Sequence, residues 1–192
     1  MLSKIKIAML SLAAFSMLFV VGCEEDEPTV PGAELSQIRV IHTSYDAPNV
    51  DVQLDGENAI TDLGYGQSSG YTSVETGTRS VTVTPTGATS PQVISENLPL
   101  EDGEVYSIFA VDSLSAISAI FTAEDKSAVQ GQAKIRFVHA SPDAPAVDIR
   151  TGSATGSAVF SDAAFKDISD YITVAPDDYM FVVTPAGVEE EV

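Results

Sequence analysis

The chain of 192 residues has one cysteine, no tryptophan, two histidines and few basic residues. A single cysteine, Cys23, excludes an intrachain disulfide, and an exported protein with a lone cysteine needs a use for it. Nine lysines and arginines stand against 28 aspartates and glutamates, which gives a formal net charge of −19. Nucleic acids and anionic lipid head groups bind basic patches, so this balance argues against both as partners.

The N-terminus has the pattern of an export signal. Lys4 and Lys6 precede an apolar run at residues 7–21, which is shorter than the roughly 20 residues that cross a bilayer as a helix. The run ends in "VVGC", which resembles a bacterial lipobox, whose cysteine is acylated. We therefore expect a lipoprotein signal peptide at 1–22 and a lipid on Cys23 that holds the exported chain to the cell envelope, at the outer membrane or the cell surface. An uncleaved membrane anchor is the alternative.

The acidic segment "EEDEPTVPGAELSQ" follows the cysteine and contains two prolines. Its composition cannot form a packed core, so we predict a flexible tether over residues 23–36.

A segment of fifteen residues then occurs twice, as "IRVIHTSYDAPNVDV" from Ile38 and "IRFVHASPDAPAVDI" from Ile135. Nine positions are identical, and both histidines of the chain match each other. Later, "VTVTPTG" matches "FVVTPAG" at nearly the same spacing. A match at a fixed spacing predicts two copies of one structural unit. We assign them to 37–122 and 133–192, with a polar linker at 123–132.

The second copy is shorter than the first. The first continues beyond "VTVTPTG" with several apolar runs, whereas the second ends soon after "FVVTPAG". We expect a truncated second unit, either because the chain belongs to a longer reading frame or because the unit is degenerate.

The apolar pattern is typical of β-strands. Val50, Val52 and Leu54 alternate with polar residues, which is the period of a half-buried strand. Turn sequences such as "LDGEN", "TPTG" and "LEDGE" recur about every 8–12 residues, as in sandwiches and barrels. We predict an all-β fold of tandem β-sandwich domains, with about seven or eight strands in the first unit.

The motif His-x-Ser-x-Asp-Ala-Pro-x-Val-Asp, followed by a tyrosine and a "GTRSVTV" strand, resembles the bacterial domain of unknown function 4397. The resemblance implies immunoglobulin-like β-sandwiches, often in tandem, in exported and lipid-anchored proteins. It implies no activity, because none is established for that family.

The charged residues of the motif suit strand pairing. If the two strands that flank the "DAP" turn pair directly, Arg39 lies opposite Asp51, and Arg136 lies opposite Asp148 in the second copy. Such a cross-strand ion pair contributes roughly 0.2–1 kcal/mol and helps to fix the register. The alternative is an arginine that binds an anionic ligand.

The two histidines have two interpretations. His42 and His139 can each be a buried imidazole that hydrogen-bonds the backbone of the adjoining turn. The other interpretation is a ligand or metal site that Asp46 and Asp143 would complete. Both aspartates also suit the turn, because Asp hydrogen-bonds the backbone two residues on.

The residues of the motif do not form a recognisable catalytic pattern. Ser44, His42 and Asp46 lie close in sequence, yet no glycine-rich oxyanion loop accompanies them. The turns "LDGEN" and "LEDGE" offer oxygen ligands for calcium but do not match an EF-hand loop. We expect a lipid-anchored protein with a structural, adhesive or interaction role, a protein or glycan partner, no catalysis and no cofactor. A surface lipoprotein that binds a glycan or a divalent cation is the second hypothesis, and a hydrolase is the third.

Overall fold

The computed structural model describes residues 33–189, which contain thirteen strands and no helix. The predicted all-β fold is therefore confirmed over this range. None of its segments is a helix long and apolar enough to cross a membrane. The predicted signal peptide, Cys23 and most of the predicted tether lie outside the described residues.

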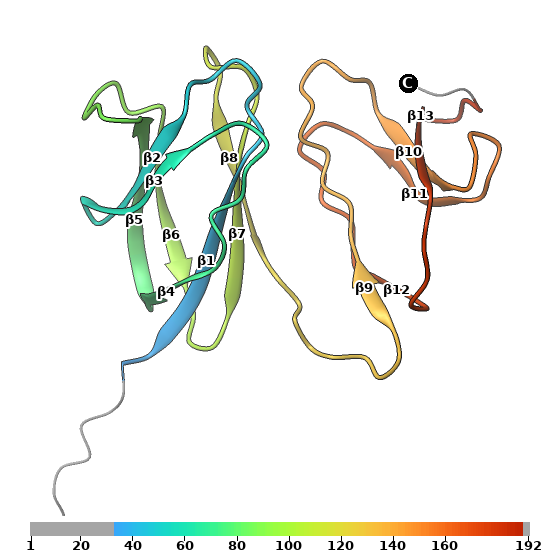
Figure 1. The fold of residues 1–192 in the computed structure, drawn as a ribbon, viewed down its shortest axis with the longest axis horizontal. Coiled ribbons are helices and arrows are strands. Elements are labelled where there is room, and N and C mark those ends of the chain that lie inside the picture. The colour runs from blue at the N-terminus through green and yellow to red at the C-terminus, as the bar shows by residue number, and fades with distance from the viewer. Residues whose placement is uncertain (1–32, 190–192) are drawn as a thin grey trace, which may run out of the picture. The chain divides into compact units, whose positions relative to one another are not determined.

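Residues 35–123, called here the N-terminal half, form two sheets of four strands. Their orders are β4-β1-β7-β8 and β3-β2-β5-β6, and the two layers can be followed in Figure 1. Strand β1 pairs antiparallel with β4 and parallel with β7. The strands are β1 (Leu35–His42), β2 (Val50–Leu54), β3 (Glu57–Leu63), β4 (Thr72–Glu75), β5 (Gly77–Pro85), β6 (Ile94–Leu100), β7 (Val105–Val111) and β8 (Ser118–Ala123).

The core of this half lies between the two sheets. Alternate residues of β1, Ile38 and Val40, are 0% and 1% exposed, because a strand sends every second side chain to the same face. Val52 on β2 and Val83 on β5 are equally buried from the other sheet, and Ile108 of β7 joins them. Two sheets around one apolar layer are consistent with a β-sandwich.

Strands β1 and β2 follow each other in the chain but belong to different sheets. The predicted cross-strand ion pair between Arg39 and Asp51 is therefore wrong, and so is its counterpart between Arg136 and Asp148. The apolar alternation of both strands is satisfied when they face each other across a core, as well as when they pair side by side. The "DAP" turn carries the chain from one layer to the other.

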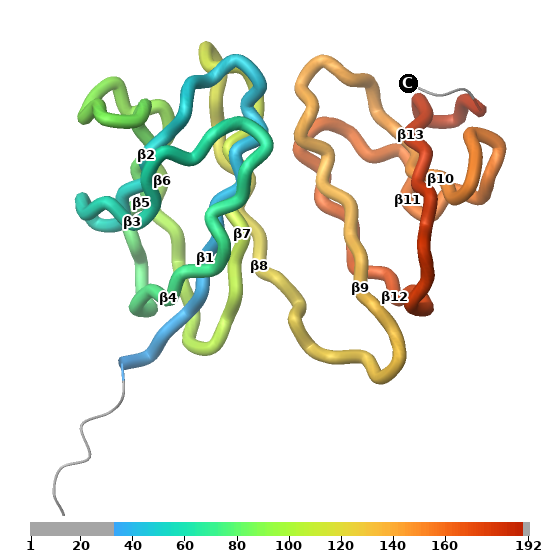
Figure 2. Tube along the Cα trace, viewed as in Figure 1, coloured from blue at the N-terminus to red at the C-terminus, as the bar shows by residue number. Residues whose placement is uncertain are grey.

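Residues 133–185, called here the C-terminal half, form two smaller sheets with the orders β12-β9 and β11-β10-β13. These pairings reproduce β4-β1 and β3-β2-β5 of the N-terminal half, including the irregular register between β10 and β11. Figure 2 traces the chain from β8 into this half. The strands are β9 (Ala133–Ile135), β10 (Val147–Thr151), β11 (Ala158–Ala163), β12 (Ile172–Val174) and β13 (Phe181–Pro185).

The C-terminal half has no counterparts of β6, β7 and β8 among the described residues. In the N-terminal half β7 pairs with β1 and β6 pairs with β5. The matching edges of β9 and β13 therefore have no strand beside them within residues 33–189.

Candidate functional site: the repeated motif and the Glu124 cluster

The repeated aspartates at the end of the motif bind backbone amides. Asp51 accepts hydrogen bonds from the backbone N–H of Asp62 (2.8 Å) and Gly87 (2.9 Å). Asp148 does the same in the C-terminal half, where its carboxylate accepts from Asp162 (2.9 Å) and Gly187 (3.1 Å). One carboxylate in each half thus joins the irregular stretch of the neighbouring strand, β3 or β11, to the turn that follows β5 or β13.

The backbone conformation at these two places explains why a carboxylate is needed. Asp62 and Gly87 have φ values of 56° and 75°, in the left-handed region that most residues avoid. Their N–H groups point out of the regular ladder and need an acceptor. The bonds from Gly87 and Asp62 lower the pKa of Asp51, and those from Asp162 and Gly187 lower the pKa of Asp148. Both carboxylates are therefore structural anions.

The repeated histidines are buried and bind the backbone of their own turns. His42 is 0% exposed and donates its Nε2–H to the carbonyl of Pro48 at 3.1 Å. His139 is 3% exposed and makes the same bond to Pro145 at 3.2 Å. A carbonyl only accepts, so the proton of each neutral ring lies on Nε2. That nitrogen is then unable to bind a metal in this arrangement.

The turn aspartates differ between the halves. Asp46 accepts a hydrogen bond from the backbone N–H of Leu114 at 2.7 Å, which ties the "DAP" turn to the loop between β7 and β8. Asp143 instead accepts from the hydroxyl of Ser141 at 3.2 Å. Across residues 33–189, no three His, Cys, Asp or Glu side chains gather in a way that could hold a metal ion.

The proposed calcium turns are occupied by internal contacts. In "LDGEN", Asp55 pairs with Arg79 at 3.1 Å and accepts the backbone N–H of Ser80 at 2.9 Å. In "LEDGE", Asp102 accepts the backbone N–H of Leu35 at 2.9 Å. Asp55 thus connects the turn between β2 and β3 to β5, and Asp102 binds the first residue of β1.

The structure gathers charged groups around Glu124, a residue that the sequence places in the linker. Its carboxylate is 8% exposed and binds Arg39 at 2.9 Å and Arg136 at 3.2 Å. The hydroxyls of Ser107 and Tyr171 also donate to it. Arg39 and Arg136 are the equivalent arginines of the two motif copies, so one linker carboxylate is shared by both.

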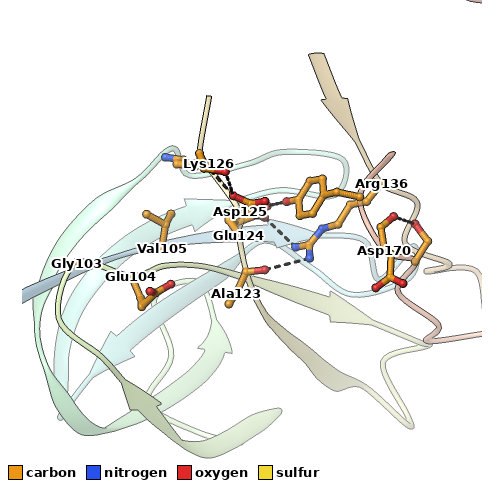
Figure 3. Close-up of a pocket in the computed structure, with 12 residues that line it drawn as sticks. Gly103, Glu104, Val105, Ala123, Glu124, Asp125, Lys126, Arg136 and Asp170 are labelled. Atoms are coloured by element: carbon orange, nitrogen blue, oxygen red, sulfur yellow. Dashed lines mark hydrogen bonds and ion pairs between the residues drawn. The ribbon is translucent and has the colours of Figure 1, made fainter. Parts of the chain in front are cut away.

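Each of these arginines also lies over a tyrosine. The guanidinium of Arg39 is 5.0 Å from the ring centroid of Tyr71, and that of Arg136 is 4.8 Å from the centroid of Tyr171. Figure 3 shows Arg136 reaching Glu124 and the carbonyl of Ala123. The two tyrosines are 100 residues apart and match each other in the two copies, and they orient the arginines by cation–π contact.

The contacts within the cluster shift the pKa values of Glu124 and Tyr171. Burial alone would raise the pKa of Glu124, but hydrogen bonds from Ser107, Tyr171 and Arg39 and the charge of Arg136 outweigh it and lower the pKa. Burial, and then the bond to Glu124, raises the pKa of Tyr171 to about 12. The carboxylate is therefore ionised and the phenol neutral at neutral pH, as an ion-pair network requires.

A cavity of about 600 Å³ adjoins this cluster, and Glu104, Asp125, Lys126 and Asp170 contribute to its lining. Two of these groups have partners: Asp125 lies 2.5 Å from Lys134, and the ammonium of Lys126 lies 3.4 Å from the ring centroid of Tyr71. The geometry is that of a structural ion-pair network.

The sequence and the strands together point to a family. A family model described as "Domain of unknown function (DUF4397)" matches residues 36–150. The chain belongs to this family. The match covers the N-terminal half from residue 36 onward and continues through β9 into β10. A search of curated proteins finds no match. The DUF4397 model assigns no activity, so the function has to be argued from the site.

Proposed function

We propose that this DUF4397 protein is a non-catalytic, lipid-anchored protein of the cell envelope that displays tandem immunoglobulin-like domains in a structural or adhesive role. The observation that carries the proposal is the repeated motif itself. Asp51 and Asp148 bind equivalent backbone amides, and His42 and His139 bind equivalent carbonyls. Repetition is therefore accounted for by folding, without a repeated active site.

The charge of the chain supports an anchor. A net charge of −19 repels anionic lipid head groups, so electrostatic attraction would not keep this protein at a membrane. Acyl chains on Cys23 would supply that attachment, because two or more chains hold a protein stably where one is marginal. The acidic segment after Cys23 would then extend from the lipid to the first strand.

Mass spectrometry of the mature N-terminus tests the anchor. We expect a chain that begins at Cys23, carries acyl groups and fractionates with membranes. Cys23→Ser should abolish acylation and leave the signal uncleaved or the protein released from membranes. An unmodified Cys23 in membrane fractions of the wild type would contradict the proposal.

A ligand-binding role is the second candidate, and exposed tyrosines favour it. Tyr45 and Tyr65 are 58% and 61% exposed, and both line a cavity of about 540 Å³ with Ser141 and Asp143. Exposed aromatic faces beside hydroxyl and carboxylate groups suit a sugar. A glycan array probed with the wild type and with Tyr65→Ala tests this role. Tyr179→Ala, at an exposed tyrosine outside this cavity, is the matched control.

A further inference from the structure

Basic side chains are scarce in this chain, yet several of them gather around one cavity. Of the nine lysines and arginines in the sequence, four line a hollow of about 550 Å³, called here the basic cavity: Arg39, Lys126, Lys134 and Arg136. Among the described residues, two carboxylates line the same hollow, those of Glu124 and Asp125. The lining therefore has a surplus of positive charge, although the whole chain has a net charge of −19.

Two of these cations converge on the ring of Tyr71. The guanidinium of Arg39 lies 5.0 Å from the ring centroid, and the ammonium of Lys126 lies 3.4 Å from it. Two like charges on one ring repel each other, and the repulsion is stronger at a protein surface than in bulk water. An anion that contacts both groups relieves this repulsion.

The same two side chains keep hydrogen-bond donors for such an anion. Arg39 uses its Nε on Ser107 and one Nη on Glu124, and within residues 33–189 its other Nη has no hydrogen-bond partner. Its side chain is 32% exposed, so a ligand can reach it. Lys126 is exposed and has no carboxylate within ion-pair distance in the described part of the chain.

The two carboxylates of the basic cavity are already bound within the chain. Asp125 pairs with Lys134, and Glu124 is shared by Arg39 and Arg136. Even so, Nη2 of Arg136 is buried and makes no hydrogen bond in the described structure, although it lies 3.2 Å from Glu124. The internal ion pairs therefore do not satisfy all the cationic donors around the cavity.

The rest of the lining limits the kind of anion. Phe109, Ile135 and Val138 give the basic cavity an apolar wall, which a bare inorganic ion would leave in water. A long polyanion would meet the acidic remainder of the chain, including Glu104 and Asp170 of the adjoining cavity. A small anion with an apolar body fits both constraints.

We propose that the basic cavity binds a small organic oxyanion, with its carboxylate or phosphate group at Arg39 and Lys126 and its apolar body against Phe109 and Val138. This gives the arginine of the first motif copy a ligand in addition to its ion pair with Glu124. The basic cavity shares no lining residue with the cavity of Tyr45 and Tyr65, so the inference goes beyond the proposed function and is independent of the glycan hypothesis.

Calorimetric titration of the purified chain with benzoate, phenyl phosphate, inorganic phosphate and benzyl alcohol tests the site. We expect saturable binding of benzoate or phenyl phosphate, and the tighter of the two identifies the charged group. Inorganic phosphate, which lacks the apolar body, should bind more weakly than the tighter of these two. Benzyl alcohol, which lacks the charge, should not bind.

A matched pair of lysine variants locates the binding. Lys126→Gln removes one cation of the site without breaking an ion pair and should weaken binding about fivefold, as expected for one partly exposed charge pair. Lys166→Gln is the control, because Lys166 is also exposed, lies over the ring of Phe165 at 5.1 Å and is outside the basic cavity. Its affinity should equal that of the wild type. Thermal melting confirms that both variants are folded.

Three results would overturn the proposal. Absence of saturable binding of both benzoate and phenyl phosphate would show that the surplus charge serves only the fold. Binding of benzyl alcohol as tight as that of benzoate would mean that the charge is not recognised. Equal affinities of Lys126→Gln and Lys166→Gln would place the anion elsewhere or make it an effect of overall charge.

Discussion

Strands β1–β5 and β9–β13 follow the same order and pairing, but only the first set is enclosed. In the N-terminal half, β6, β7 and β8 complete both sheets and seal the core. In the C-terminal half Ile149 of β10 stays buried, but Phe181 and Val183 of β13 are each 41% exposed. The motif residues His139 and Asp148 nevertheless keep the contacts of His42 and Asp51. The motif thus fixes local turns, and the later strands supply burial.

The largest expected effect separates the two cores. Val83→Asp places a charge in a closed apolar layer and should cost about 4 kcal/mol or more of unfolding free energy. Val183→Asp leaves the charge at an open edge and should cost less than about 1 kcal/mol. Urea unfolding of the two variants measures both values. Similar costs would mean that the C-terminal core is as closed as the N-terminal one.

The motif aspartates should behave alike in both halves. Asp51→Ala leaves two backbone N–H groups without their acceptor and should lower the unfolding free energy by about 2 kcal/mol, and Asp148→Ala should do the same. Asp51→Asn keeps one acceptor oxygen and should cost less. Urea unfolding again supplies the measurement. A large effect at only one of the two aspartates would break the equivalence of the motif copies.

The shared carboxylate gives a smaller effect that depends on pH. The pKa of Glu124 is lower in the folded chain than in the unfolded one, so its contribution is present above the unfolded-state pKa and is lost as the pH falls through the folded-state pKa. Glu124→Gln should therefore cost about 1–2 kcal/mol at pH 7, and the difference from wild type should shrink in acid. Glu96→Gln, at an exposed carboxylate of β6, is the control. Melting curves at several pH values test this, and a constant difference would contradict it.

Calcium should have the smallest effect. Asp55 and Asp102 already accept hydrogen bonds from backbone N–H groups elsewhere in the chain. Among the described residues, no group of three possible metal ligands includes them. Adding millimolar calcium should leave the melting temperature unchanged, apart from the general screening of an acidic chain that magnesium would give equally. A shift specific to calcium would revive the divalent-cation hypothesis.

The sequence predicts local features of this fold well and distant contacts poorly. The alternation in β2 and the turn sequences predict strands and their ends, and the repeated motif identifies the equivalent positions. The pairing of β1 with β7 brings together residues 68 apart, as with Arg39 and Ser107, and no periodicity records it. For the same reason the sequence predicts Asp51 as the partner of Arg39, whereas the actual partner, Glu124, lies 85 residues away.

Within the motif, too, local contacts could be predicted from the sequence and distant contacts could not. The hydrogen bond of His42 to Pro48 spans six residues and follows from the turn, so it could be predicted. The pairing of Asp51 with Gly87 spans 36 residues and depends on how β2 meets β5. Only the folded sheet shows that this carboxylate serves backbone amides, where the sequence suggested a salt bridge.

Hydrogen exchange measured by mass spectrometry tests the central claim most directly. Peptides that cover β5 and β13 have the same pairing to β2 and β10, but only β5 has a second neighbour, β6, among the described residues. We predict slow exchange across β5 and β7 and markedly faster exchange in β13 and β9, because backbone amides at an open edge exchange without unfolding. Equal protection of β5 and β13 in the isolated chain would contradict the account.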